Sequence, residues 1–99
     1  MAYTNDQFRF HHWGLRKIER SLLRKGVSER NVREALASIS PASHDEAILE
    51  LIRKKWNGLK DGDVRIKRMK VIRFLVGKGF EPSRVTELFS QFLNEIAPR

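Results

Sequence analysis

The feature that most constrains the fold of this chain is an internal repeat, in which residues 17–36 resemble residues 70–89 at an offset of 53. In each copy a glycine separates two stretches with apolar residues at helical spacing, which is typical of a helix, a tight turn and a second helix. Such repetition predicts a fold assembled from similar helical units. The identical pairs are Lys17/Lys70, Arg20/Arg73, Leu22/Leu75, Lys25/Lys78, Gly26/Gly79, Val32/Val85 and Glu34/Glu87.

The same helical spacing extends along nearly the whole chain. No stretch alternates between apolar and polar residues as a half-buried strand does, so the sequence predicts an all-α fold. We expect helices at residues 12–25, 28–39, 43–56 and 64–78 and from residue 82 onward, with a shorter helical turn within residues 5–10.

Capping residues support several of these boundaries. Gly26 suits the end of the first long helix, because glycine adopts the left-handed cap conformation without a steric penalty. Ser43, followed three residues later by Glu46, forms a capping box and predicts the start of the third helix there. In the fourth helix the residues expected to face the core are Met69, Ile72 and Val76.

The repeat also predicts how the units follow one another. We expect a first three-helix repeat at residues 12–57 and a second, shorter helical repeat at residues 58–99, which together form an elongated, curved array. Residues 1–11 are expected to be the end of a preceding repeat, in which case the chain is a piece of a longer repeat protein. The residues expected to have structural roles, as core aromatics or as glycines that join helices, are Trp13, Gly14, Gly26, Trp56 and Gly79.

Positive charge is concentrated in two segments. The chain has 20 Lys and Arg residues against 12 Asp and Glu, a formal net charge of +8, which favours an acidic or polyanionic partner. Arg16, Arg20 and Arg24 recur every four residues and predict a ridge along one helix. The candidate partner-binding or nucleic-acid-binding residues are Arg16, Lys17, Arg20, Arg24, Arg53, Lys54, Arg65, Lys67, Arg68 and Lys70.

Other classes of site lack support in the sequence. The chain has no cysteine, and His11, His12 and His44 have no spacing that would gather them around a metal, so we expect neither a metal nor a cofactor. No arrangement of nucleophile and base suggests catalysis, so we expect that the chain is not an enzyme. Without a long apolar segment, we expect no membrane partner. We also expect the chain to be cytoplasmic and monomeric.

Taken together, these residues resemble the bacterial RecX family of recombination regulators. WGLRKIERSLLRKGVSERNVREAL at residues 13–36 is similar to the tryptophan-glycine opening and glycine turn of that family. LIRKKWNGL at residues 51–59 and KVIRFLVGKGFEPSRV at residues 70–85 are similar to its later repeat. Gly77 and Glu81 depart from the pattern, which usually has a basic residue and a serine there, so contacts at this turn are not carried over.

The resemblance implies tandem three-helix repeats and a regulatory role. It implies a protein that binds in the groove of the filament formed by the RecA recombinase on single-stranded DNA. Such a protein would limit filament growth and inhibit the recombinase, ATPase and SOS co-protease activities. The chain is similar to the middle and carboxy-terminal repeats of the family, and the first repeat has no counterpart.

A stand-alone DNA-binding module is the alternative, because two helices joined by a glycine turn also describe a helix-turn-helix that could bind single- or double-stranded DNA. Against it, the candidate recognition helix at residues 28–39 balances Arg30 and Arg33 with Glu29 and Glu34. A third alternative is a structural repeat whose charge only keeps it soluble.

Overall fold

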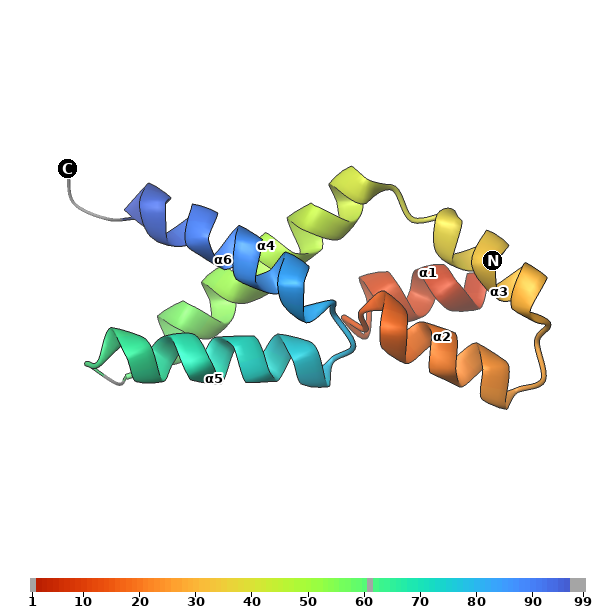
Figure 1. Ribbon diagram of the computed structural model, residues 1–99, viewed down its shortest axis with the longest axis horizontal. Helices are drawn as coiled ribbons and strands as arrows, with labels where there is room; N and C mark the ends of the chain where they lie inside the picture. Colours follow the sequence, from red (N-terminus) through yellow and green to blue (C-terminus); the bar gives the residue numbers. More distant parts are fainter. Residues whose placement is uncertain (1, 61, 97–99) are drawn as a thin grey trace.

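The all-α prediction is confirmed by a computed structural model, which describes residues 2–60 and 62–96 (Figure 1). Within these residues the chain forms six helices and no strand. The helices are α1 (Ala2–Arg9), α2 (Leu15–Arg24), α3 (Glu29–Ala37), α4 (Pro41–Gly58), α5 (Val64–Gly77) and α6 (Pro82–Ile96).

The helices pack as two groups of three along an elongated molecule. In the first group α2 contacts α1 and α3, and in the second α4, α5 and α6 all contact one another. The molecule measures 48 × 22 × 22 Å, so the predicted elongated array of helical repeats is confirmed. The expected repeats were at residues 12–57 and 58–99, and the contacts group the helices differently. In each copy of the internal repeat, the pair of helices that a glycine turn joins packs against the helix that precedes the pair.

Two expectations about single helices are wrong. Met69 and Val76 on α5 were expected to face the core, but they are exposed, and Val71 and Leu75 are buried instead. Apolar residues occur on every side of α5, so periodicity alone does not identify its inner face.

The start of α4 also differs from the expectation. The helix begins at Pro41, and the hydroxyl of Ser40 accepts a hydrogen bond of 3.1 Å from the backbone N–H of Ser43. Ser40 is therefore the capping residue, and Ser43 lies inside the first turn. Proline suits the first helical position because it has no N–H to leave unsatisfied.

One hydrophobic core runs through both groups of helices. Trp56 on α4 is half-buried and packs edgewise on Phe89 and Phe92 of α6, with ring centroids 5.7 and 6.0 Å apart. Full burial of a side chain such as that of Phe89 contributes on the order of 1.5–3 kcal/mol. The core residues with the least exposure are Ile18, Leu22, Ile48, Ile52, Val71, Leu75, Phe80, Val85 and Phe89.

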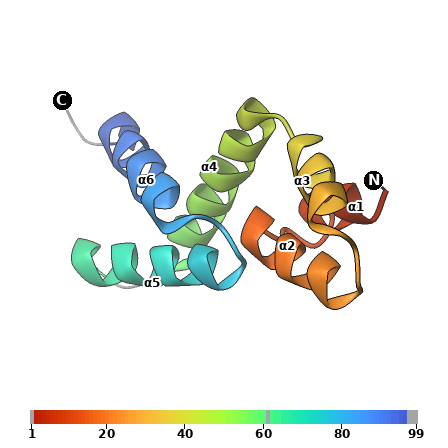
Figure 2. The same ribbon diagram turned by 45° about the vertical axis from the view of Figure 1, so that its right-hand side comes forward.

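The two groups are joined where α5 ends and α2 begins. The backbone N–H of Gly14 donates to the carbonyl of Lys78 at 2.7 Å, and that of Arg16 donates to the carbonyl of Gly79 at 3.0 Å. The free carbonyls at the end of one helix thus pair with the free N–H groups at the start of another, in the orientation that aligns the helix dipoles. Figures 1 and 2 show the two helices following one another along the molecule.

Glycine is required at both sides of this joint. A Cβ atom on Gly14 would overlap the backbone of Gly79 and Phe80, and a Cβ atom on Gly79 would lie 2.5 Å from that of Lys17. Gly79 also has a φ of +99°, which few other residues adopt. The Trp-Gly opening and the glycine turn of the second copy are therefore complementary parts of one contact.

Side chains complete the joint. The imidazole of His44 on α4 lies between the rings of Phe8 and Phe80, with centroid distances of 6.4 and 5.7 Å. Arg16 on α2 forms an ion pair of 2.5 Å with Glu81, just before α6. The joint therefore combines backbone hydrogen bonds, contacts between aromatic rings and a surface ion pair.

Candidate partner-binding surface

The predicted ridge of arginines on α2 is exposed. Arg16, Arg20 and Arg24 are accessible to solvent, whereas Ile18 and Leu22 on the opposite side of the helix are buried. The four-residue spacing places the three guanidinium groups along one face. The face is therefore open to a partner along the length of α2.

Lys17 differs from its neighbours on α2. It is half-buried, and its ammonium group lies 4.6 Å from the ring centroid of Trp13. Trp13 is also half-buried and packs on the core beside Gly14. Lys17 and Trp13 therefore support the start of α2, and their interaction leaves less of the cation for a partner.

Two of the predicted contact residues on α5 pack against aromatic rings. The ammonium group of Lys67 lies 4.0 Å from the ring centroid of Trp56, and the guanidinium of Arg68 lies 5.8 Å from that of Phe89. Both side chains are half-buried, so their aliphatic stems cover part of the core. We therefore exclude Lys67 and Arg68 from the candidate partner-binding surface.

The remaining cations of α5 are exposed. Arg65 and Lys70, both predicted, are accessible to solvent, and so is Arg73, which is not among the predicted contact residues. The internal repeat could have identified Arg73, because it occupies the position of Arg20 in the second copy.

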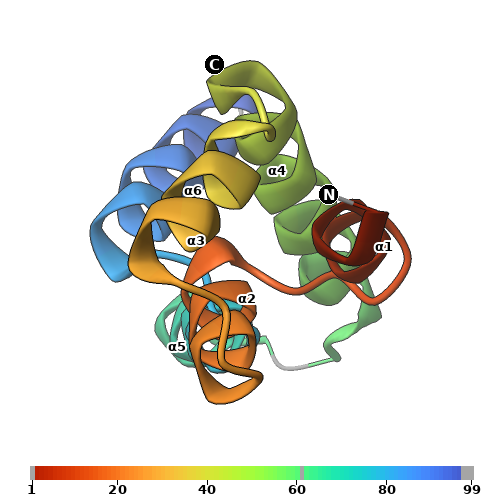
Figure 3. The same ribbon diagram turned by 90° about the vertical axis from the view of Figure 1, so that its right-hand side faces the viewer.

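The exposed faces of α2 and α5 form one continuous edge of the molecule. Figures 1 and 2 show these helices end to end, and in Figure 3, viewed along the molecule, they overlap on the same side. The faces meet at a groove of about 410 Å³, which we call the junction groove, lined by Arg16, Glu19, Arg20, Val76, Gly79 and Phe80. We define the basic edge as Arg16, Arg20, Arg24, Arg65, Lys70 and Arg73.

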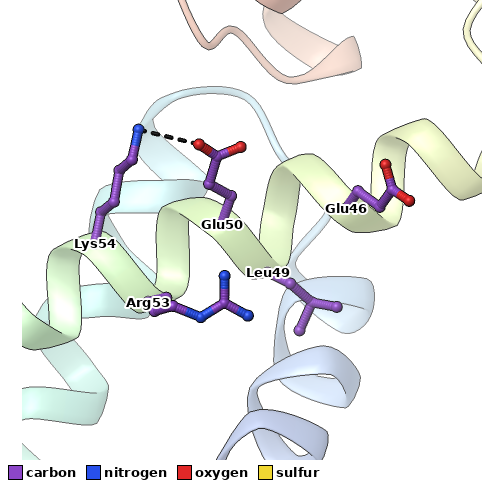
Figure 4. A pocket seen from close by; sticks show the side chains of 5 residues that line it. All are labelled: Glu46, Leu49, Glu50, Arg53 and Lys54. Carbon is purple, nitrogen blue, oxygen red and sulfur yellow. Dashed lines mark ion pairs between the residues drawn. The ribbon is translucent and has the colours of Figure 1, made fainter.

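Arg53 and Lys54 lie apart from the basic edge, on the outer face of α4 (Figure 4). They line a shallow pocket of about 450 Å³ together with Glu46, Leu49 and Glu50. The ammonium of Lys54 pairs with Glu50 at 3.1 Å, and this hydrogen bond lowers the pKa of the Glu50 carboxyl. Because carboxylates share the pocket, it is less suited to an anionic partner than the basic edge.

Arg84 on α6 is bound within the chain. Its guanidinium donates two hydrogen bonds to the carboxylate of Asp45, one of them from Nε at 2.9 Å, and a third to Glu87 at 2.6 Å. The Arg84 hydrogen bond is the main cause that lowers the pKa of the Asp45 carboxyl. Arg84 therefore links α6 to α4 through its ion pair with Asp45.

Over residues 2–60 and 62–96, no three His, Asp or Glu side chains gather in a way that could hold a metal ion. His44 lies between two phenylalanine rings, and burial lowers its pKa. In the same part of the chain, every helix is too short or too polar to cross a membrane.

Comparison with known protein families supports the resemblance drawn from the sequence. The model of the second three-helix domain of RecX matches residues 1–36, and that of the third matches residues 44–88. These segments agree with the two groups of helices seen in the structure. No solved structure matches the chain significantly.

Curated relatives carry the same family name. The chain is 34% identical over 84 residues to "Regulatory protein RecX" of Clostridium botulinum (strain Eklund 17B / Type B), which covers 82% of this chain and 39% of the relative. The protein of that name from Clostridium perfringens (strain 13 / Type A) is 35% identical over 81 residues, covering 80% and 37%. That from Chlorobium phaeobacteroides (strain BS1) is 33% identical over 78 residues, covering 79% and 49%. The chain thus spans less than half the length of these relatives.

Proposed function

Because this chain belongs to the RecX family of regulatory proteins, we propose that it binds the filament of a RecA-type recombinase on single-stranded DNA and inhibits its activities. The activities concerned are filament growth, strand exchange, ATP hydrolysis and the co-protease function of the SOS response. We propose that it acts in the cytoplasm as a monomer and without catalysis of its own.

The basic edge is the observation that carries this proposal. It draws cations from both groups of helices and extends along the longest dimension of the molecule, 48 Å. An extended, positively charged strip matches an extended, negatively charged groove better than it matches a compact ligand. Charge of one sign also accelerates the encounter with such a partner at low ionic strength.

The proposed mechanism is steric and electrostatic. A rigid rod bound along the filament would touch more than one recombinase subunit, so subunits could not be added or rearranged without breaking contacts with it. The glycine joint supports this, because its backbone hydrogen bonds fix the direction of α2 relative to α5. Inhibition would then require both groups of helices together.

The test is the rate of ATP hydrolysis by a RecA-type recombinase on single-stranded DNA, measured with and without this chain. We expect micromolar amounts of the chain to lower the rate. An unchanged rate, together with an unchanged amount of recombinase on the DNA, would refute the proposal.

Binding to bare duplex DNA serves as the control for the alternative function. Strong duplex binding with a steep dependence on salt, in the absence of recombinase, would favour a stand-alone DNA-binding module. The helices that would enter the major groove in such a module are α3 and α6. Arg30 pairs with Glu34 at 3.5 Å and Arg84 pairs with Asp45, which leaves Arg33 as the other arginine of these two helices, so we expect weak binding.

A further inference from the structure

The solvent side of α5 carries an apolar ridge. Ile66, Met69 and Val76 are 40%, 46% and 36% exposed, and they lie at positions i, i+3 and i+10 with Arg73 at i+7. All four therefore share one face of the helix, opposite the buried Val71. None of the helices in the described part of the chain covers this face, since α4 and α6 pack on the other side.

Exposed cations flank the ridge, namely Arg65, Lys70 and Arg73. α5 contains five cations and no carboxylate between Val64 and Gly77. At its carboxy-terminal end the ridge enters the junction groove, where Val76 meets Arg16 and Arg20 of α2. The surface is thus an apolar strip flanked mainly by cations, with the carboxylate of Glu19 also lining the groove.

We propose that this ridge binds an acidic amphipathic helix of the recombinase protein, an inference that rests on the proposed function and specifies which component of the filament meets α5. Residues 66–76 span about 15 Å, which matches about three turns of a partner helix. Such a helix would present apolar side chains at i, i+3 or i+4, and i+7, flanked by Asp or Glu.

Other occupants match the surface less well. A nucleic-acid backbone would pair with the cations but would leave the exposed Ile66 and Met69 without apolar contacts. A second copy of the chain would bring the exposed Arg65, Lys70 and Arg73 of α5 against the same three cations. A lipid surface favours a broad apolar face with large aromatic residues, whereas this ridge is narrow and has Arg73 at its centre.

Photochemical cross-linking identifies the molecule that binds the apolar ridge of α5. A variant with p-benzoylphenylalanine in place of Met69 is bound to recombinase filaments on single-stranded DNA, irradiated and analysed by mass spectrometry. A second variant carries the same group in place of Ile96, which is exposed at the end of α6. We expect the Met69 variant to cross-link to an acidic helical segment of the recombinase, and the Ile96 variant not to react with that segment.

Two outcomes would overturn the inference. One is that the Met69 variant cross-links to DNA, to a segment without acidic residues or to another copy of the chain. The other is that the Met69 variant gives no cross-linked product although the chain sediments with the filament. If the chain does not sediment with filaments at all, the proposed function fails and this inference fails with it.

Substitution gives a second readout that does not depend on cross-linking. Met69→Ser should weaken binding to the filament about tenfold without changing its dependence on salt, because the side chain contributes apolar contact and no charge. Met69→Leu keeps an apolar side chain of similar volume and should bind like the parent chain. Equal affinity of the Ser and Leu variants would contradict the proposed contact.

Discussion

Gly14 and Gly79 are far apart in the sequence, yet they meet at the joint between α5 and α2, where neither position has room for a side chain. A Cβ atom on Gly14 would lie 2.3 Å from backbone atoms of Gly79 and Phe80, and a Cβ atom on Gly79 would lie 2.5 Å from the Cβ atom of Lys17. Gly58 and Gly77 have nothing within 4 Å of such an atom, and neither has a positive φ. At the scale of single residues, the glycines of this chain therefore differ sharply in importance.

Gly14→Ala should destabilise the chain by at least about 2 kcal/mol, because the new methyl group overlaps backbone atoms that cannot move aside. Gly77→Ala is the matched control. Gly77 lies at the end of α5 in open space, so alanine there should leave stability unchanged or raise it by less than about 1 kcal/mol. Urea unfolding followed by circular dichroism measures both, and a similar loss in the two variants would contradict the proposed close approach.

His44 should make stability depend on pH. Burial lowers its pKa in the folded state below the ordinary value of 6.5, so the unfolded chain binds a proton more readily than the folded one. The stabilisation is complete above pH 6.5 and is lost as the pH falls from there through the lower pKa of the folded state.

Urea unfolding at about pH 7.5 and about pH 5.5 tests this dependence. We expect lower stability at the lower pH, and a smaller difference in the variant His44→Leu, which has no ionisable group between the rings of Phe8 and Phe80. Asp45, whose pKa is lowered from 3.8, contributes only in a more acidic range. Equal pH dependence in the parent chain and the variant would refute the role of His44.

At the scale of helices, much of the fold could be predicted from the sequence. The internal repeat identified α2, α3, α5 and α6, because apolar spacing and glycine turns are local signals. The sequence did not predict that each copy of the repeat packs on the helix that precedes it. That packing depends on contacts between residues far apart in the sequence. The buried face of α5 was missed for a related reason, because apolar residues occur on all sides of that helix.

The candidate site was only partly predictable. The exposed ridge of Arg16, Arg20 and Arg24 follows from its spacing. The packing of Lys67 and Arg68 on aromatic rings does not, because those rings belong to α4 and α6.

The start of α4 offers a test at this scale. Ser40→Ala should cost about 1 kcal/mol, because the first turn of α4 would lose the oxygen that accepts from the N–H of Ser43. Ser43→Ala should cost less, since the Ser43 hydroxyl receives only a hydrogen bond of 2.9 Å from that of Ser40. Thermal unfolding of the two variants compares them, and a larger loss for Ser43→Ala would show that the capping residue is Ser43.

At the scale of the whole molecule, the joint determines the function we propose. Because α5 and α2 meet end to end, two groups of cations separated in the sequence form a single edge. The repeat places Arg20 and Arg73 at equivalent positions on either side of the joint. A partner that spans the joint would contact both.

The affinity of the chain for recombinase filaments on single-stranded DNA, measured for paired arginine variants, tests this account most directly. Arg20→Ala combined with Arg73→Ala removes one cation from each half of the basic edge and should weaken binding about tenfold or more. Arg30→Ala combined with Arg33→Ala removes the same charge from the exposed surface of α3 and should change affinity less than about twofold. Equal losses in the two double variants would show that net charge, and not the basic edge, drives binding and would contradict the account.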